Sequence, residues 1–442
     1  MKAHAQQPWL SDRQYGEGIG VRVGNLELHP GISGEVGYDS NYFLRSDKDT
    51  PPPDASYRLR ITPSVSLATL GTQRTQGNGA PAVQTLTFRG NAYVSYNELI
   101  AADSKNSQEF QDQRHVDVGT DLALNLFPAG RVGVDSYLNF IRVGQPSNDP
   151  GTENAFDRDS LRAGAGATWR PGGGLFDWRL GYEFLYNYFE KSAFTTLNNF
   201  QHTINMRGRW RFLPRTAVLY DGGYTWVDYA HDKRSSQSDG AIVRARLGLN
   251  GLVTTRLSLL GMIGWAGTFY EAKANQPAQQ YDSVVAQAEV KYFISGGQEA
   301  INAGTAPVGM SYVLAGYTRD VSNSYLGNYF RRDRGYLGVS YLLGGVFVSS
   351  LTAGISNLAF PPSTGIDGTT ELAPAFNQQR FDAQLFGEYR LSNTFGLNAT
   401  VLYDQTLNDQ VINTTVVNGV GTTQDHLEFA RWQAYLGVRW FL

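Results

Sequence analysis

Apolar and polar residues alternate along most of this chain. Within residues 116–126, one parity holds mostly valine and leucine, and the other holds aspartate, asparagine, glycine and alanine. The same alternation returns at 161–170, 284–291, 381–390 and 432–442. A period of two is typical of β-strands that have one apolar face and one polar face.

The apolar faces need a cover. No run of apolar residues follows helical spacing, and no second set of strands is available to cover a water-soluble sheet. Lipid is the alternative cover, and the polar faces then surround a lumen. We therefore predict an all-β fold, a transmembrane antiparallel up-and-down β-barrel of about eighteen strands, with the first near 30–45 and the last near 427–442.

The predicted connections fall into two alternating classes. One class is short, as at 128–130, 213–215 and 392–394, with longer exceptions at 70–82 and 295–306. The other class is long and polar: 46–54, 100–113, 145–157, 230–239, 272–281, 360–378 and 408–426. This sorting is typical of bacterial outer-membrane barrels, with the short turns in the periplasm. We predict an outer-membrane location, with both termini on the periplasmic side.

Two domains are expected. Residues 28–442 form the transmembrane barrel, and residues 1–27 form a periplasmic N-terminal segment. Ala3 and Ala5 have the spacing that ends a secretory signal, so this segment is either a signal remnant or a plug of the lumen.

The outward face is expected to combine an aliphatic band with aromatic ends. The positions predicted to face lipid are Leu59, Ile61, Val65, Leu122, Leu124, Val134, Leu180, Val243, Leu247, Leu257, Leu259, Val339, Leu385, Leu397, Val401 and Leu436. The predicted aromatic girdles at the two interfaces include Trp169, Trp178, Trp210, Trp226, Tyr341 and Trp440. The alternative explanation is that aromatic residues simply favour strands.

The inward parity is rich in charge. The residues predicted to line the lumen are Arg58, Arg60, Arg89, Asp117, Asp121, Asp135, Arg162, Arg179, Glu183, Arg207, Arg209, Arg244, Arg246, Glu289, Lys291, Arg380, Asp382, Glu388 and Arg431. Such residues are costly against lipid, so they must face water or one another. They favour a wet channel with a mild preference for anions or polar sugars, or they pair with one another to hold the wall. Both interpretations can hold together.

Charge, composition and missing motifs argue against several classes of function. The net charge of −3 gives no general attraction to nucleic acid, and the chain has no cysteine. Metalloprotease, hydrolase and P-loop motifs are absent and the six histidines are scattered, so we predict no enzyme, no cofactor and no metal site. The loop acids Asp47, Asp49 and Asp54 either bind calcium or the cations that bridge lipopolysaccharide, or are solvated loop charges.

Two segments carry a resemblance to known proteins. Residues 30–43, with Gly37-Tyr38-Asp39, and the later Pro63 step resemble the start of the β-barrel porin type 2 family. That resemblance implies an outer-membrane barrel, and more loosely a role in exopolysaccharide export in Gram-negative bacteria. Residues 431–442 resemble the C-terminal strand that the barrel-assembly machinery recognises, although Phe441 is penultimate here and the family form usually ends in phenylalanine.

We therefore predict an outer-membrane pore that passes polar solutes or an exported polysaccharide through an arginine-rich, mixed-charge lumen. Loops 360–378 and 408–426, or residues 6–27, are expected to constrict it. The alternative is a structural anchor or docking barrel of an envelope complex, with a plugged lumen. The expected partners are outer-membrane lipid and lipopolysaccharide, the barrel-assembly machinery and periplasmic export components.

Overall fold

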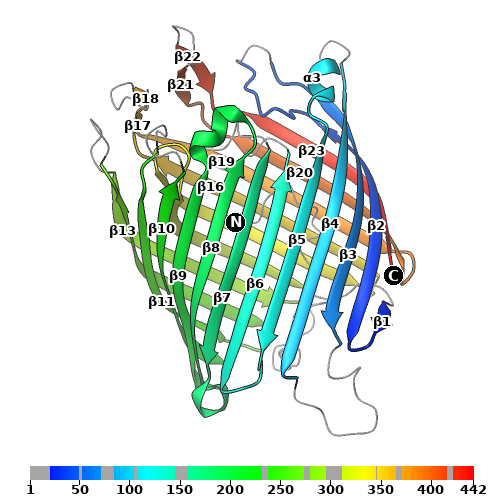
Figure 1. Cartoon of the computed structure of the whole chain (residues 1–442), viewed down its shortest axis with the longest axis vertical. Coiled ribbons are helices and arrows are strands. Elements are labelled where there is room, and N and C mark those ends of the chain that lie inside the picture. Colours follow the sequence, from blue (N-terminus) through cyan, green and yellow to red (C-terminus); the bar gives the residue numbers. More distant parts are fainter. Residues whose placement is uncertain are drawn as a thin grey trace.

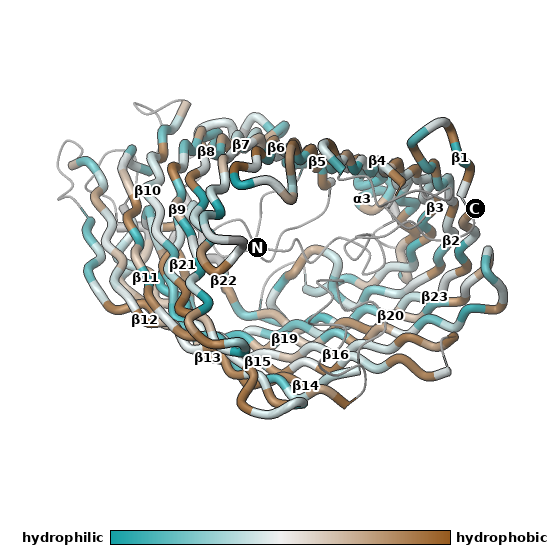
Figure 2. Tube along the Cα trace, turned by 90° about the horizontal axis from the view of Figure 1, so that it is seen from below, coloured by the Kyte–Doolittle hydropathy of each residue, from teal (hydrophilic) through white to brown (hydrophobic). Residues whose placement is uncertain are grey.

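One closed β-barrel dominates the structure. The computed structural model describes residues 20–48, 52–70, 84–103, 107–144, 157–230, 237–272, 279–294, 311–344, 346–364, 371–415 and 422–442. Within these ranges, eighteen long antiparallel strands form the barrel wall, as predicted (Figure 1). Viewed from below, they make a ring that is wider in one direction than in the other (Figure 2).

The wall strands are 12 to 16 residues long. They are β2 (Leu26–Asp39), β3 (Ser56–Thr69), β4 (Leu86–Ala101), β5 (His115–Leu126), β6 (Val132–Val143), β7 (Arg158–Trp169), β8 (Phe176–Phe189), β9 (Asn199–Leu213), β10 (Thr216–Tyr229), β11 (Gly240–Leu252), β12 (Leu257–Tyr270), β13 (Gln280–Phe293), β14 (Tyr312–Asn323), β15 (Tyr329–Leu343), β16 (Phe347–Phe360), β19 (Phe376–Arg390), β20 (Phe395–Thr406) and β23 (Ala430–Phe441).

The barrel closes between its first and last wall strands. Residues 31–39 of β2 pair with residues 433–441 of β23, so each wall strand has a neighbour on both sides. A short strand, β1 (Val21–Val23), adds to the start of β2. Closure is what a sheet needs in lipid, where an exposed strand edge would leave backbone groups without hydrogen bonds.

The first wall strand differs from its predicted bounds of 30–45. It begins at Leu26 and ends at Asp39. The side-chain amide of Asn41 turns the chain there, because it accepts a hydrogen bond from the Arg45 backbone and donates one to the Arg45 carbonyl. Tyr42 then points into a buried cluster, so its apolar character marks a folded loop and not a continued strand.

The connections are sorted between the two ends of the barrel as predicted. At the upper end in Figure 1 lie helix α3 (Ser107–Gln111) and the short hairpins formed by β17 (Ser363–Thr364) with β18 (Glu371–Ala373) and by β21 (Val411–Thr415) with β22 (Thr422–His426). The 3-10 segments η2 (Pro171–Gly174) and η3 (Ser192–Leu197) lie in connections at opposite ends. Turns such as 214–215 and 391–394 form the lower end, where His29 Nδ1 lies 3.1 Å from the carbonyl oxygen of Leu442.

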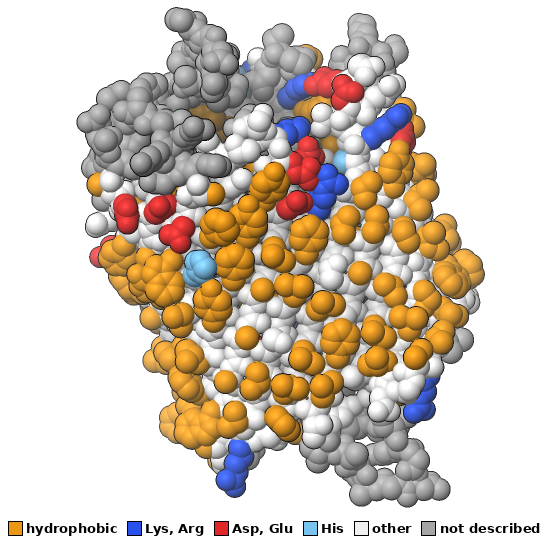
Figure 3. Space-filling view, viewed as in Figure 1, with side chains coloured by type: hydrophobic (Ala, Val, Ile, Leu, Met, Phe, Trp, Pro, Cys, Tyr) orange, Lys and Arg blue, Asp and Glu red, His pale blue; other side chains and the backbone are white. Residues whose placement is uncertain are grey.

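The outer surface carries a broad apolar band. On the face shown in Figure 3, hydrophobic side chains cover the middle of the barrel, and charged side chains gather toward its ends. The positions predicted to face lipid all lie on the outward parity of their strands, and Leu436 is 65% exposed. No helix in the described ranges is long and apolar enough to cross a membrane.

Replacement of Ile263 by arginine tests which face meets lipid. Ile263 lies at the middle of β12 on the outward parity and is 65% exposed. We expect Ile263→Arg to lower the free energy of unfolding in lipid by ~2–4 kcal/mol, because a guanidinium at mid-depth must enter hydrocarbon. Urea titration of the barrel in lipid vesicles measures this change.

Two variants on the same strand serve as controls. Leu259 also faces outward but lies near the periplasmic end of β12, so Leu259→Arg should cost less. Met262 faces inward, so Met262→Gln should be tolerated. Equal stability of the three variants would contradict the outward assignment of Ile263.

Candidate functional site: the barrel lumen

The polar faces of the strands surround the lumen. Each residue predicted to line it lies on the inward parity of its strand. The predicted girdle residues lie on outward positions, with Trp226 toward the long loops and the others toward the short turns. Whether these residues serve a pore and a girdle stays a prediction.

Buried ion pairs fill the lumen where the barrel closes. Asp39 is fully buried and accepts a hydrogen bond of 2.9 Å from Arg431 Nε, which joins β2 to β23. Arg58 Nη1 lies 3.8 Å from the same carboxylate and donates a hydrogen bond of 3.1 Å to Tyr435. Arg60 pairs with buried Glu35 at 2.8 Å. These pairs tie the first two strands to the last.

The neighbouring sector is also filled with side chains. Arg439 pairs with Glu388, and Arg380 pairs with Asp404 at 3.1 Å. Tyr93 of β4 packs against Phe386 of β19 across five strand intervals of the wall, forming a small buried cluster. The lumen between β19 and β4 is therefore occupied by protein.

The sector from β4 to β9 is different, because several of its lumen-facing charges reach water, although Arg179 of β8 is buried. The side chains of Arg89 and Asp121 are 45% and 46% exposed, and those of Arg162 and Arg209 are 43% and 42% exposed. Fully exposed lysine or arginine needs no partner, but a buried one does. A wet wall of mixed charge therefore faces the lumen here.

Most arginines of this wall still have carboxylate partners. Arg179 donates a hydrogen bond of 2.8 Å to Asp135, and Arg209 donates one of 3.0 Å to Asp177. Asp177 was not among the predicted residues, although it shares the inward parity of Arg179 and the alternation contained that signal. Pairing between lumen charges is thus confirmed for much of the wall.

Two arginines have no partner among the described residues. Arg207 and Arg211 of β9 are exposed and face inward, and their side chains form no hydrogen bond or ion pair with any part of the chain that the structure describes. Arg207 lies opposite Arg179 and Asp221 in the ladder, but those two are already engaged with Asp135 and Arg246. The wet wall therefore carries an excess of positive charge on β9.

The tip of the β14–β15 hairpin folds into the lumen. β13 pairs with β14 only from Phe293–Tyr312 to Ala286–Arg319, whereas β14 and β15 stay paired to Asn323–Tyr329. Above Arg319, the outward parity of the hairpin packs against the inner faces of β12 and β13. Val321 is buried in a cluster with Val285 and Ala266 for this reason.

Polar contacts hold this hairpin tip in place. Asn323 donates to the Tyr229 hydroxyl at 3.0 Å and accepts from the Tyr270 hydroxyl at 3.1 Å. Tyr325 packs edge-on against Phe189 and accepts a hydrogen bond from Asn199 at 3.1 Å. These contacts carry the tip across to β8, β9 and β10. The inward hairpin is a constriction that the sequence analysis missed.

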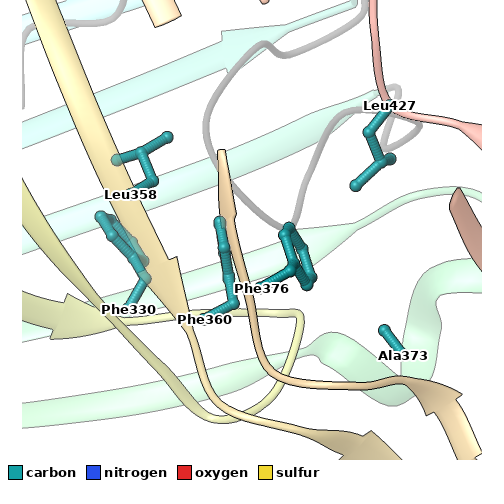
Figure 4. Packing of buried hydrophobic residues seen from close by; sticks show 6 residues of the cluster. All are labelled: Phe330, Leu358, Phe360, Ala373, Phe376 and Leu427. Atoms are coloured by element: carbon teal, nitrogen blue, oxygen red, sulfur yellow. The ribbon is translucent and has the colours of Figure 1, made fainter. Parts of the chain in front are cut away.

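Two apolar clusters line the extracellular mouth. Tyr42 and Phe43 pack with Leu99 and with Phe110 of α3. The second cluster joins β15, β16 and β19 to the flanks of the last two long loops, and contains Phe330, Leu358, Phe360, Ala373, Phe376 and Leu427 (Figure 4). Of the predicted constricting segments, residues 365–370, 416–421 and 6–19 lie outside the described residues.

The loop acids and candidate metal ligands are placed as follows. Asp54 pairs with Arg45 at 2.8 Å, Asp47 is exposed, and Asp49 lies outside the described residues. In the part of the chain that the structure describes, no three histidine, aspartate or glutamate side chains are grouped to hold a metal ion.

Comparisons with known proteins concern the fold. No family model and no curated protein matches the chain. The FrpB iron transporter of Neisseria meningitidis (F5-1 variant) is 9% identical, with a TM-score of 0.47 that covers 96% of this chain and 82% of that one. OpdQ of Pseudomonas aeruginosa is 10% identical, with a TM-score of 0.45 and coverage of 95% and 98%. OccK5 of the same species is 10% identical, with a TM-score of 0.42 and coverage of 94% and 98%.

At such identities and TM-scores, the likeness extends no further than a large closed barrel. Closure, the apolar outer band and the sorted loops define an outer-membrane β-barrel. The protein lies in the bacterial outer membrane. The resemblance of residues 30–43 to the β-barrel porin type 2 family stays a prediction.

The buried ion pair between Asp39 and Arg431 predicts that one amide substitution has a large effect on the free energy of unfolding. Asp39→Asn removes the only negative charge that Arg431 contacts within the described ion pairs and leaves Arg58 nearby. Breaking a buried pair costs about 3–5 kcal/mol of folding free energy. Urea unfolding in lipid should therefore show a clear loss of stability.

The matched control is Asp121→Asn. Asp121 faces Arg89 at 3.8 Å, and both side chains are nearly half exposed. Such a pair contributes about 0–1 kcal/mol, so this variant should unfold almost like the parent. Similar losses from both variants would show that burial does not decide the strength of these pairs.

The extracellular loops are tied together by a pH-dependent contact. Lys48 donates hydrogen bonds to Asp409 at 2.8 Å and contacts Glu428 at 2.9 Å, and His426 Nδ1 lies 2.8 Å from Asp409. Partial burial raises the pKa of Asp409, but the hydrogen bonds from Lys48 and His426 outweigh it and hold this pKa below its ordinary value of 3.8. A lowered pKa stabilises the contact above pH 3.8, and that stabilisation is lost as the pH falls through the lowered pKa.

Spin labels on the two loops measure this effect. Because the chain has no cysteine, D47C and Q410C give a unique labelled pair. The distribution of distances between the labels should be narrow at about pH 6 and broaden as the pH falls through the lowered pKa of Asp409. Asp409→Asn should give the broad distribution above and below this pKa. A distribution that stays narrow in acid would contradict the role of Asp409.

Proposed function

We propose that this protein is an outer-membrane pore for polar solutes with a preference for anions. The observation that supports it most is the set of water-exposed, lumen-facing charges on β4, β5, β7 and β9. A wall meant only to be buried would place apolar side chains at these positions, because unpaired charges are costly away from water. Rings and rows of arginine are the usual lining of anion-selective pores.

An exported polysaccharide is the more specific substrate that we propose. The resemblance of residues 30–43 to exopolysaccharide-associated barrels supports it. The inward hairpin adds tyrosine and asparagine side chains, such as Tyr325 and Asn323, which suit the hydroxyl groups of a sugar chain. On this proposal, periplasmic export components deliver the chain and the barrel-assembly machinery inserts the barrel through the strand that ends at Phe441.

A docking barrel with a plugged lumen is the second candidate. The filled sector between β19 and β4 favours it, because the ion pairs there serve the wall and leave no passage. Single-channel conductance in planar bilayers separates the two functions. A pore gives steps of constant size, and a plugged barrel gives none.

The β9 arginines provide the test of anion preference. We expect the double variant R207Q/R211Q to keep conductance while its anion-to-cation permeability ratio falls by about half, because the unpaired positive charge is removed from the wet wall. Reversal potentials measured in a salt gradient give this ratio.

The control removes one arginine charge from the outer face. Arg142 faces outward at the extracellular end of β6 and pairs with Glu190 at 2.6 Å. Arg142→Gln should leave the permeability ratio unchanged. An unchanged ratio in R207Q/R211Q, despite measurable conductance, would exclude β9 as the source of selectivity.

A further inference from the structure

Five arginines gather on the inner face of the wall at its periplasmic end. They lie on β9 and at the periplasmic ends of β6 and β7, along one side of the ring (Figure 2). Each has the inward parity of its strand, which in β6 is the parity of Asp135. We call this set the periplasmic arginine patch, and its members are Arg131, Arg170, Arg207, Arg209 and Arg211.

Part of the patch forms a row across four neighbouring strands. The Arg170 amide donates a hydrogen bond of 2.7 Å to the Arg131 carbonyl, one step beyond the last listed pair of β6 with β7, Val132 with Trp169. Residues that lie opposite each other in a ladder share one face of the sheet, so both arginines face the lumen. Asp177 follows on β8, and Arg209 lies opposite it on β9.

Contacts of the Arg170 side chain confirm its inward direction. Its Nη1 donates a hydrogen bond of 3.4 Å to the Gly130 carbonyl, in the turn that carries Arg131. The same nitrogen lies over Gly133, where a Cβ atom would approach it to 2.8 Å. Gly133 has the inward parity of Asp135, so the Arg170 guanidinium crosses the inner face of β6 toward Arg131.

The patch carries more positive charge than its carboxylate can balance. Asp177 accepts a hydrogen bond of 3.0 Å from Arg209 and lies 3.9 Å from Arg170 Nε. The side chain of Arg131, like those of Arg207 and Arg211, has no hydrogen bond or ion pair with any residue that the structure describes. Like charges that lie opposite each other in a sheet are destabilising, so an anion bound here would stabilise the wall.

The patch is wider than one small anion. Neighbouring strands are about 4.8 Å apart, so the row from Arg131 to Arg209 extends over about 14 Å. Arg207 and Arg211 are separated by about 13 Å along β9. A single carboxylate or phosphate reaches only part of this area, whereas a chain with repeated anionic groups can contact several arginines at once. Because Arg207 lies four residues inside Arg211, an extended chain reaches it more easily than the surface of a folded protein does.

We propose that the periplasmic arginine patch binds an acidic polysaccharide, with carboxylate groups repeated along its chain, where the chain enters the barrel. Arginine suits a carboxylate because its planar group presents two parallel donors. This inference rests on the proposed passage of a polysaccharide, and it adds the charge of that polymer and the end at which it is captured. A neutral polysaccharide would leave the unpaired arginines without partners.

Isothermal titration calorimetry on the purified barrel in detergent tests the proposal. The probe is a short oligogalacturonate, which carries one carboxylate on each sugar, and its fully methyl-esterified form is the uncharged control. We expect the oligogalacturonate to bind and the ester not to bind. R131Q/R211Q should weaken binding by about tenfold or more, because each charge-assisted hydrogen bond contributes substantially. Equal binding of the ester, or unchanged binding in R131Q/R211Q, would overturn the proposal.

The matched control removes two arginines from the outer face of the extracellular end. Arg114 pairs with Glu98, and Arg142 pairs with Glu190 at 2.6 Å. R114Q/R142Q changes the net charge of the protein as much as R131Q/R211Q does, but it should bind oligogalacturonate like the parent. The same loss of binding in both double variants would mean that overall charge, and not the patch, attracts the polymer.

A further variant acts in the opposite direction. Asp177 competes with the polymer for Arg209 and Arg170, so Asp177→Asn should tighten binding of oligogalacturonate several-fold. This measurement keeps the proposal testable if R131Q/R211Q does not fold. Weaker or unchanged binding in Asp177→Asn would contradict the placement of the polymer on this row.

Competitors distinguish the kinds of anion. Monomeric galacturonate should displace the oligomer only at far higher concentration, because it reaches only part of the patch. Phosphatidylglycerol should not displace it, since the patch faces the lumen and not the lipid. Displacement by the monomer at the concentration of the oligomer would show a simple anion site, and displacement by phosphatidylglycerol would show a lipid site; either result would overturn the proposal.

Binding and conduction can fail separately. Calorimetry needs neither a membrane nor an open lumen. A barrel that binds oligogalacturonate but gives no conductance steps would contradict the pore and support the patch. A barrel that conducts but does not bind oligogalacturonate would overturn the patch and leave the pore.

Discussion

The backbone of this chain must find its hydrogen bonds within the protein, because lipid offers none. The pairing of β2 with β23 meets that requirement, since it removes the edges that an open sheet would expose. Once the ring is closed, each side chain has only two directions, toward lipid or toward the lumen. The alternation of apolar and polar residues along each strand reflects these two directions.

Closure also decides where charge can be placed. Around the seam, Asp39 and Arg431 are removed from water and depend on each other, so their pairing contributes to the joint between the first and last strands. On β9 the wall is wet, and Arg207 can remain without a carboxylate. The same residue type is thus buried in ion pairs in one sector and exposed on the lumen side of the wall in another. Burial, and not sequence, distinguishes the two.

Parity and loop length allowed the barrel, its strand number and its inward charges to be predicted from sequence. Partners were harder, because pairing across strands depends on register. Arg207 lies between Arg179 and Asp221, yet both are engaged elsewhere, which alternation alone does not reveal. The inward hairpin was missed for a related reason. Val321 keeps the outward parity of β14, but its strand has moved behind β13, so an outward side chain packs against inner faces.

One change in the path of the wall therefore produces two features inside the barrel. Because β14 leaves β13 at Arg319, the hairpin tip enters the lumen and its polar residues reach β9 and β10. The same departure leaves residues 280–285 of β13 without a ladder partner on that side, and the outward parity of the hairpin packs against the inner faces of β12 and β13 instead. Arg319 accordingly lies 3.5 Å from Ser283, whose side chain is on the inward parity of β13. The seating of the hairpin tip inside the barrel thus depends on the point at which the ladder between β13 and β14 ends.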